Sequence, residues 1–223
     1  RLIIESVLAE RRSALTELES KTLLSSFLIP VTQTVRARSA TEAMMLATQL
    51  GFPVALKIDS PDIAHKSDVQ GVALDLANGA AVRDAYTDMV ERVARLKPQA
   101  RINGVTVQKM APARRGREIN IGVVTDDPFG PVIVFGAGGT MIELIGDRAM
   151  ELPPLNRYLA HRLIERSRVA DTLGEWRGAS AIDMDMLEHV LLRVSEMVCE
   201  LPQLREMDIN PIITDENGAV AVD

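Results

Sequence analysis

The sequence predicts an α+β fold, α/β in the broad sense, with two groups of strands. Apolar strand-like runs alternate with segments of helical periodicity along all 223 residues. Capping signatures mark where several helices begin, and Gly or Pro residues mark where they end. A natural hinge near residues 108–112 separates the two groups. We therefore expect one domain with two lobes, the first over about 30–107 and the second over about 108–223 together with the N-terminal helix.

Five helices are expected, and capping signatures locate the start of three of them. Thr16 with Glu19, and Ser39 with Glu42, have the spacing of a capping box, in which two side chains satisfy amides of the first helical turn. Asn78 is a further N-cap candidate. The predicted helices cover about residues 16–27, 39–51, 78–96, 156–168 and 183–200.

Seven strands are expected between and after these helices. Pro128-Phe129-Gly130 has the composition of a turn between two strands, and Asn217-Gly218 is a strong hairpin signal. The short basic stretch Ala111–Gly116 has the character of a linker. The predicted strands cover about residues 53–58, 71–76, 105–110, 118–125, 131–135, 206–214 and 219–223.

The overall composition narrows the classes of function. Hydrophobic residues make up 47% of the chain and charged residues 25%, as in an ordinary globular domain. The formal net charge of −6 argues against a nucleic-acid partner, although local lysines can still bind a smaller anion. We find no apolar run of membrane-spanning length and no signal peptide, and Cys199 is the single cysteine. A reducing cytoplasm is the expected setting.

The segment from Lys57 to Val72 contains the clearest candidates for ligand-binding or reactive residues. Lys57 ends an apolar strand, and a buried ammonium group requires an anion, so it is a candidate phosphate ligand. The alternative is a side chain that reaches solvent from the strand end. His65 follows in a polar loop, where an exposed histidine without a special role is the alternative to a reactive one.

Strand alternation near the C-terminus groups three oxygen-bearing side chains. Glu206, Asp208 and Asn210 fall on one face of a predicted strand, with Met207, Ile209 and Pro211 inside. Asp223 ends the adjoining strand and is expected to face Asn210. Such oxygen ligands suit a hard cation, and a solvated strand face is the alternative.

Other candidates are weaker when each is taken alone. Gly136–Gly139 follows a strand and would let backbone amides approach an anion, but its spacing fits neither a Walker A loop nor a dinucleotide fingerprint. A tight structural turn is the alternative. By residue type alone, Lys21 and Glu118 are interpreted as surface charges, and His161 and His189 as structural or exposed.

Four segments, taken together and in order, resemble the ATP-grasp domain of NDP-forming acyl-CoA synthetases. They are His65-Lys66-Ser67-Asp68-Val69-Gln70-Gly71-Val72, Phe129-Gly130-Pro131, Phe135-Gly136-Ala137-Gly138-Gly139 and Asp208-Ile209-Asn210-Pro211. The resemblance spans nearly the whole chain and implies an ATP-grasp fold with the nucleotide between two lobes. The stretch from Glu151 to Arg168 further resembles the synthetase-like region of large bacterial GNAT-type protein lysine acetyltransferases, so we expect a domain cut from a larger protein.

The resemblance implies a role for each candidate residue. His65 corresponds to the histidine that passes phosphate between the nucleotide and a second histidine in the ligase part. Lys57 corresponds to the lysine that holds the ATP phosphates, Lys21 to a helix lysine near the nucleotide, and Gly136–Gly139 to a loop near the partner domains. The remaining implied roles are adenine contact for Gln108, Lys109 and Met110 with Glu118 beside them, and Mg²⁺ coordination for Asn210 and Asp223 with Asp208 close by.

The implied function is ATP/ADP–Mg²⁺ binding and phosphoryl transfer through a phosphohistidine in an acid–CoA ligase (ADP-forming). The reaction converts acyl-CoA, ADP and phosphate to carboxylate, ATP and CoA. The implied partners are CoA-binding and ligase domains of the same protein and a downstream GNAT domain, with CoA and the carboxylate bound through those domains. The isolated domain is not expected to complete this reaction.

Gln70 departs from the family pattern. Active members have two glycines before Val72, and here Gln70 replaces the first. This departure favours an alternative, a non-catalytic nucleotide-sensing or scaffold domain of a protein lysine acetyltransferase. A third interpretation is an ATP-grasp carboxylate–amine ligase, against which the histidine-bearing loop argues.

Overall fold

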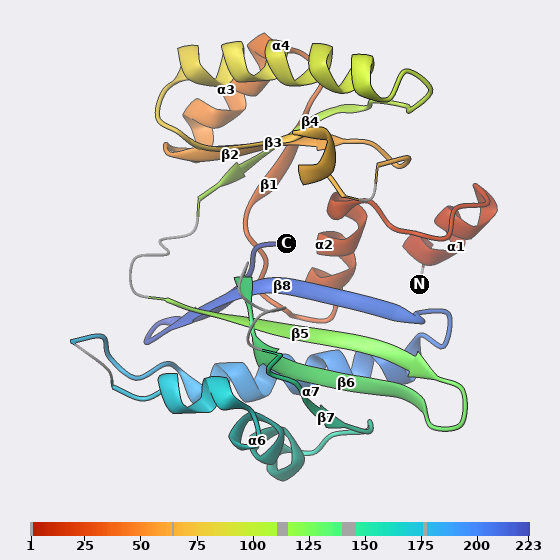
Figure 1. Cartoon of the computed structure of the whole chain (residues 1–223), viewed down its shortest axis with the longest axis vertical. Helices are drawn as coiled ribbons and strands as arrows, with labels where there is room; N and C mark the ends of the chain where they lie inside the picture. The colour runs from red at the N-terminus through yellow and green to blue at the C-terminus, as the bar shows by residue number, and fades with distance from the viewer. Residues whose placement is uncertain (1, 64, 111–115, 140–145, 176–177) are drawn as a thin grey trace. The chain divides into compact units, whose positions relative to one another are not determined.

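Contacts divide the chain into two compact units. The structure, a computed structural model, describes residues 2–63, 65–110, 116–139, 146–175 and 178–223 (Figure 1). The first unit contains Leu2–Thr22 and Thr32–Met110, and the second contains Leu23–Val31 and Ala111–Asp223 together with Arg1. Most of the proposed linker, residues 111–115, lies outside the described residues.

The boundary after Met110 lies within the predicted hinge at residues 108–112, but the N-terminal residues through Thr22 group with the first unit rather than the second. This difference has a physical cause, because side chains of the second helix bind the first sheet. Lys21 donates from Nζ to Gln108 at 2.9 Å, a contact that no local sequence pattern predicts.

The first unit is built on a four-stranded antiparallel sheet. Its order is β1-β4-β2-β3. Helices α3 and α4 lie on one face of this sheet, as Figure 1 shows. The elements of the unit are α1 (Leu2–Ala9), the N-terminal part of α2 (Glu17–Ser26), β1 (Thr34–Ala37), α3 (Ala40–Leu50), β2 (Val54–Asp59), η1 (Ser67–Val69), β3 (Val72–Leu76), α4 (Gly79–Leu96) and β4 (Gly104–Lys109).

The predicted helix caps are present in the first unit. Glu19 accepts from the Thr16 amide at 2.7 Å, and Thr16 accepts in return from the Glu19 amide at 3.4 Å, which completes the capping box of α2. The Ser39 and Asn78 side chains accept amide hydrogen bonds in the first turns of α3 and α4. Gly51 ends α3 at φ 84°, a conformation that favours glycine. These local interactions explain why sequence reasoning located the three helices.

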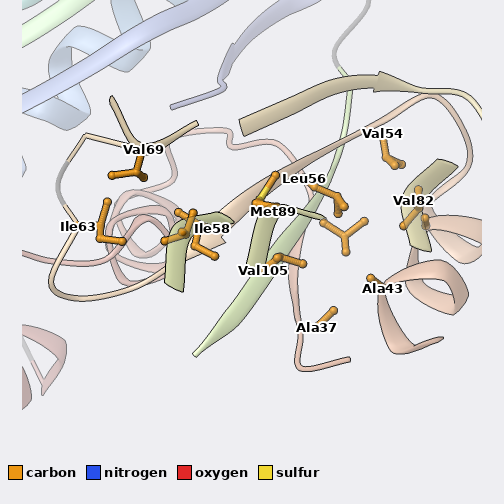
Figure 2. Close-up of a cluster of buried hydrophobic side chains, with 13 residues drawn as sticks. Ala37, Ala43, Val54, Leu56, Ile58, Ile63, Val69, Val82, Met89 and Val105 are labelled. Carbon is orange, nitrogen blue, oxygen red and sulfur yellow. The ribbon is translucent and has the colours of Figure 1, made fainter. Parts of the chain in front are cut away.

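The core of the first unit lies between the sheet and its two helices (Figure 2). Val54, Leu56 and Ile58 alternate along β2 and are fully buried on the helix-covered side. Ile63 and Val69, which flank the histidine-bearing loop, belong to the same cluster with 8% and 4% exposure. The loop is therefore anchored in the core on both sides of His65.

The second unit is built on a five-stranded antiparallel sheet. Its order is β7-β6-β5-β8-β9, and α6 and α7 lie on one face of it (Figure 1). The elements of the unit are β5 (Arg117–Asp126), β6 (Gly130–Ala137), β7 (Ala149–Glu151), α6 (Arg157–Glu165), η3 (Arg168–Thr172), α7 (Met184–Glu200), β8 (Glu206–Asp215) and β9 (Gly218–Ala221). Across the described ranges, every helix is too short or too polar to cross a bilayer.

Among the described α-helices and β-strands, three were not predicted, namely α1, β1 and β7. β1 and β7 have four and three residues, too few for a periodic signal, and both are edge strands. The helix predicted to reach residue 168 ends earlier, at Glu165, and a 3₁₀ turn follows it. Sheet pairing and tertiary packing, rather than local pattern, decide these segments.

Candidate functional site

Three lysine side chains converge on one buried carboxylate in the first unit. Glu17 Oε1 lies 2.9 Å from Lys21 Nζ and 3.1 Å from Lys57 Nζ, and Glu17 Oε2 lies 2.8 Å from Lys66 Nζ. The Glu17 side chain is 5% exposed. We call Glu17, Lys21, Lys57 and Lys66 the lysine cluster. The interpretation of Lys21 as a surface charge is therefore wrong, because its ammonium group is buried and hydrogen-bonded.

Strand geometry explains how Lys57 reaches this cluster. In β2, Val54, Leu56 and Ile58 point to the apolar core, so Lys57 points to the opposite face of the sheet. Lys57 is 5% exposed, which excludes the alternative of a side chain that reaches solvent. A buried lysine requires an anion, and Glu17 supplies one.

Lys21 has a second set of partners on the same face of the sheet. Its Nζ donates to the Thr32 hydroxyl at 3.1 Å, the Thr34 hydroxyl at 2.9 Å and Gln108 Oε1 at 2.9 Å. Gln108 is 2% exposed and pairs with Ala55 across the sheet. The face of this sheet opposite α3 and α4 is thus lined with polar groups that fix the lysine positions.

The cluster controls the ionisation of Glu17. Burial alone would raise the pKa of this carboxyl, but Lys57, Lys21 and Lys66 together outweigh burial and lower the pKa to about 2. Glu17 is therefore charged at neutral pH. A group of ammonium ions held around one anion is a suitable environment for a further, multiply charged anion.

His65 occupies an exposed loop directly before Lys66. A 3₁₀ turn, η1, follows, and the amides of Gln70 and Gly71 donate to the carbonyls of Ser67 and Lys66 at 3.0 and 2.8 Å. Gln70 has φ 54° and ψ 34°, the left-handed region that favours glycine. The sequence departure at Gln70 thus falls where the backbone itself calls for glycine.

The second unit carries the predicted oxygen ligands on β8 and just beyond β9. Asp208 Oδ1 accepts from Asn120 Nδ2 at 2.6 Å, and Asn210 Oδ1 accepts from the Gly139 amide at 2.8 Å. The Asn210 amide donates to the Asp223 carbonyl at 3.1 Å, so these two residues are adjacent as predicted.

The simple alternation predicted for β8 holds only at its start. Asp208 is exposed and Ile209 is buried, but Asn210 and Pro211 are both half-buried, and Ile212 is buried again. The pairing with β5 explains the break, because Ile119 pairs with Ile212 whereas Ile121 pairs with Ile209. β8 therefore has one extra residue at Asn210–Pro211, a bulge of the kind that redirects side chains near functional sites.

The glycine-rich segment after β6 is in tight contact with this region. The Gly138 amide donates to the Glu118 carbonyl at 2.9 Å. A Cβ at Gly138 would overlap the Ile119 backbone, and one at Gly139 would overlap the Glu118 side chain. The alternative of a tight structural turn thus accounts for these two glycines.

The donor set of the second unit fits a hard cation. Asp208 and Asp223 offer carboxylates and Asn210 offers an amide oxygen, which keeps a second lone pair beside its bond to Gly139. No group of three or more His, Cys, Asp or Glu side chains able to hold a metal occurs among the described residues. A cation at this place would accordingly depend on Asn210 as well as on the aspartates.

The other predicted nucleotide contacts lie near the end of the first unit and the start of the second. Lys109, the last residue of β4, is exposed, and its amide donates to the Gln33 carbonyl at 3.2 Å. Met110 is half-buried, and its amide donates to the Pro53 carbonyl at 3.2 Å. Glu118 is exposed near the start of β5. Their adenine role stays a prediction.

Sequence reasoning missed several polar residues that organise these places. Glu17 was not singled out, because a glutamate in the first turn of a helix is common. Asn120 sits in an otherwise apolar strand and is 5% exposed, a signal that could have been noticed. Asp147 is 4% exposed and accepts from the amides of three residues distant in sequence, which no local pattern indicates.

His161 has a structural environment on α6, as predicted. Its Nδ1 lies 2.7 Å from Glu188 Oε1, and Glu188 also accepts from Arg157 Nε at 2.8 Å. The interaction with Glu188 is the main cause that raises the pKa of His161, with Glu165 contributing.

Comparisons with known proteins agree over nearly the whole chain. A family model described as an ATP-grasp domain matches residues 6–223. The chain is 36% identical over 223 residues to the beta subunit of acetate–CoA ligase (ADP-forming) I from Pyrococcus furiosus, covering 100% of this chain and 95% of that subunit.

Solved structures from one archaeal enzyme are also similar. The dinucleotide-forming acetyl-coenzyme A synthetase 1 of Ca. Korarchaeum cryptofilum, in complex with coenzyme A and Ca-AMPCP, gives a TM-score of 0.95 at 37% identity, covering 100% of this chain and 96% of that one. A second structure of that synthetase contains Mg-AMPPCP and has its phosphohistidine segment pointing towards the nucleotide binding site. It gives a TM-score of 0.86 at 34% identity, with the same coverage of 100% and 96%.

Proposed function

The chain belongs to the ATP-grasp family, in the type found in beta subunits of ADP-forming acetate–CoA ligases, and from this premise we propose that it binds ATP and ADP with Mg²⁺ and passes phosphate through His65. The reaction in which it takes part is acyl-CoA + ADP + phosphate ⇌ carboxylate + ATP + CoA. The single observation that carries this proposal is the lysine cluster, in which Lys66, the residue next to His65, shares a buried carboxylate with Lys21 and Lys57.

His65 is suited to accept the terminal phosphoryl group of ATP. One nitrogen of a neutral imidazole carries a lone pair, which attacks the γ-phosphorus while the bond to the β-phosphate oxygen breaks. That bonding electron pair leaves with ADP, and the proton on the other ring nitrogen of His65 stays in place. Phosphoryl transfer of this kind depends chiefly on positioning and on neutralised charge.

Lys21 and Lys57 of the lysine cluster supply the positive charge for the phosphates in this proposal. Lys57 and Lys21 are held rigidly by Glu17 and by hydroxyl and amide oxygens of the sheet, so little side-chain freedom is lost when an anion binds. Bound Mg²⁺ would offset further phosphate charge. Asp208, Asn210 and Asp223 are the proposed metal ligands.

The adenine is proposed to contact Gln108, Lys109 and Met110, with Glu118 close to it. Gln108 Oε1 accepts from Lys21 Nζ at 2.9 Å, which places this residue beside the lysine cluster. Lys109 and Met110 engage their backbone amides within the first unit, which leaves their carbonyls and side chains as the candidate contacts.

The proposed partners are a CoA-binding and a ligase domain, which would contribute the sites for CoA and the carboxylate. The P. furiosus relative is named as a beta subunit, which supports a partner chain or domain. A narrower proposal places this chain in a protein with a GNAT-type acetyltransferase domain, and the segment Glu151–Arg168 together with Gln70 supports it. The non-catalytic alternative is not favoured, because the relatives that match the full chain are ligases.

Calorimetric titration tests the nucleotide site first. ATP and ADP are titrated with and without Mg²⁺ into the wild type, Lys57→Met and, as a matched control, Lys97→Met. Lys97 is an exposed lysine at the end of α4 and outside the lysine cluster. We expect Mg²⁺-dependent binding that Lys57→Met weakens at least tenfold, since a charged hydrogen bond contributes about 1.5–3 kcal/mol, and that Lys97→Met retains.

Phosphate transfer is tested on the same proteins. After incubation with γ-³²P-ATP, the wild type should carry an acid-labile, alkali-stable label, and His65→Asn should carry none. If wild type, Lys57→Met and Lys97→Met all fail to bind millimolar nucleotide, both alone and with the ligase partner, the proposal is wrong. Label that persists in His65→Asn would show that another residue accepts the phosphoryl group.

A further inference from the structure

The two carboxylate oxygens of Glu17 bind different lysines. Oε1 binds Lys21 on its own helix and Lys57 on β2, both of which are nearly fully buried. Oε2 binds Lys66, whose side chain is 19% exposed and belongs to the histidine-bearing loop. One carboxylate thus connects the proposed phosphate-binding lysines to the segment that carries His65.

The histidine-bearing loop is fixed at both of its ends. Ile63 and Val69 anchor it in the core on either side (Figure 2). His65 lies two residues from Ile63, and an extended chain spans at most about 3.3–3.6 Å per residue, so His65 can range over roughly 7 Å while that anchor stays buried. The Lys66–Glu17 ion pair removes this freedom at the residue next to His65.

We propose that Glu17 is a positioning residue that holds the His65 loop at the nucleotide-binding lysines through its ion pair with Lys66. This inference rests on the proposed function, and it adds a residue and a contact that hold the reacting histidine in place. Glu17 itself touches neither the nucleotide nor the reacting nitrogen in this account.

The charges in the cluster make this tie releasable. When Lys66 leaves, Glu17 keeps Lys21 and Lys57 on Oε1, so no buried carboxylate is left without a cation. Lys66 is partly exposed and can exchange Glu17 for water at modest cost. Lys57, by contrast, is buried and cannot be hydrated in the same way. The loop can therefore detach without disturbing the lysines that would hold the phosphates.

A purely structural role for Glu17 makes different predictions. If Glu17 only neutralises Lys21 and Lys57, its loss should weaken the fold and nucleotide binding, and Lys66 should be dispensable. If Glu17 positions the loop, removal of Lys66 should loosen the loop and slow transfer to His65 while nucleotide affinity is kept. The variant Lys66→Met separates the two cases, because it alters a partly exposed side chain and leaves the buried pairs intact.

Amide hydrogen exchange reports on the loop without nucleotide. The proteins compared are wild type, Lys66→Met, Glu17→Gln, the double variant, and the controls Lys97→Met and Glu19→Gln. The Gln70 and Gly71 amides, which close the turn after Lys66, should exchange about tenfold faster in Lys66→Met, because the ion pair with the buried Glu17 carboxylate is lost. The double variant should exchange no faster than Glu17→Gln alone, since both changes remove one interaction.

Kinetics on the full chain supply the second readout. Lys66→Met should lower the rate of ³²P transfer to His65 about tenfold and change the ADP dissociation constant less than threefold. Glu17→Gln should lower the transfer rate and also raise the ADP dissociation constant. The inference is overturned if Lys66→Met matches Lys97→Met in exchange and in transfer, or if the two variants act additively. A wild type that binds no nucleotide, either alone or with the ligase partner, would refute the proposed function, and the exchange data would still decide whether Glu17 holds the loop.

Discussion

Asp147 offers the sharpest test of how the second unit is held together. Its side chain is 4% exposed and accepts from the amides of Arg168 at 2.7 Å, Val169 at 2.8 Å and Ala137 at 3.2 Å. The first two amides begin the η3 turn, and the third ends β6. One carboxylate thus connects β6 to η3, and no local sequence pattern predicts this connection.

Asp147→Ala should lower the free energy of unfolding by about 4 kcal/mol. The change leaves two buried amides and one part-buried amide without an acceptor, each at a cost of about 1–3 kcal/mol, with the longest bond contributing least. Asp147→Asn should cost about half as much. An amide oxygen in the place of Oδ2 can still accept from Ala137 and Val169, whereas the NH₂ group would face the Arg168 amide, a second donor.

Urea denaturation followed by circular dichroism measures the two losses, and amide exchange at Arg168 and Val169 locates them. Asp171→Ala is the matched control, because Asp171 lies in the same turn with an exposed side chain, and it should change stability by less than about 0.5 kcal/mol. The reasoning fails if Asp147→Ala costs less than about 1 kcal/mol and both amides remain protected.

Three further predictions concern charge and backbone strain. Glu17 has a folded-state pKa of about 2, below its unfolded value of 4.5, so its ionisation contributes about 3 kcal/mol to the free energy of unfolding above pH 4.5. This contribution is lost as pH falls towards 2. The free energy of unfolding should therefore fall less steeply with acid in Glu17→Gln than in the wild type, and equal slopes would contradict this. The pKa of His161 is raised mainly by Glu188, so the protonated ring stabilises the fold below pH 6.5, and this stabilisation is lost as pH rises through the folded-state pKa. Because the ring is half-exposed, we expect only a few tenths of a kcal/mol. This pH dependence of the free energy of unfolding should be absent in His161→Gln. Gln70→Gly relieves a left-handed residue and should raise the free energy of unfolding by about 0.5–1 kcal/mol in urea titrations, and a decrease would show that the strain argument is wrong.

Much of the fold follows from local pattern. The caps at Thr16, Ser39 and Asn78 act within four residues, so they are visible in sequence and recur in the structure. The ATP-grasp resemblance, carried by four short segments, predicted the fold that the family match and the similar structures support.

The candidate site was only partly visible in the sequence, for a physical reason. Lys57 was found because a lysine is unusual in an apolar strand, but Glu17, which binds it, lies 40 residues away in an ordinary helix turn. The bulge at Asn210 was likewise hidden, since it exists only in the pairing of β8 with β5. Contacts between distant segments decide which polar residues are buried together, and composition does not encode them.

The glycine-rich segment shows how an anion-binding pattern can serve a different purpose. Its amides are engaged by protein groups: Ala137 donates to Asp147, Gly138 to the Glu118 carbonyl, and Gly139 to Asn210 Oδ1. A phosphate would have to displace these bonds, so the described part of the segment is poorly suited to hold one. Glycine is needed at Gly138 because a Cβ would overlap the β5 backbone, and at Gly139 because its φ of 76° favours glycine. The segment thereby fixes Asn210, a proposed Mg²⁺ ligand, and leaves the proposed phosphate contacts to Lys21 and Lys57 of the first unit.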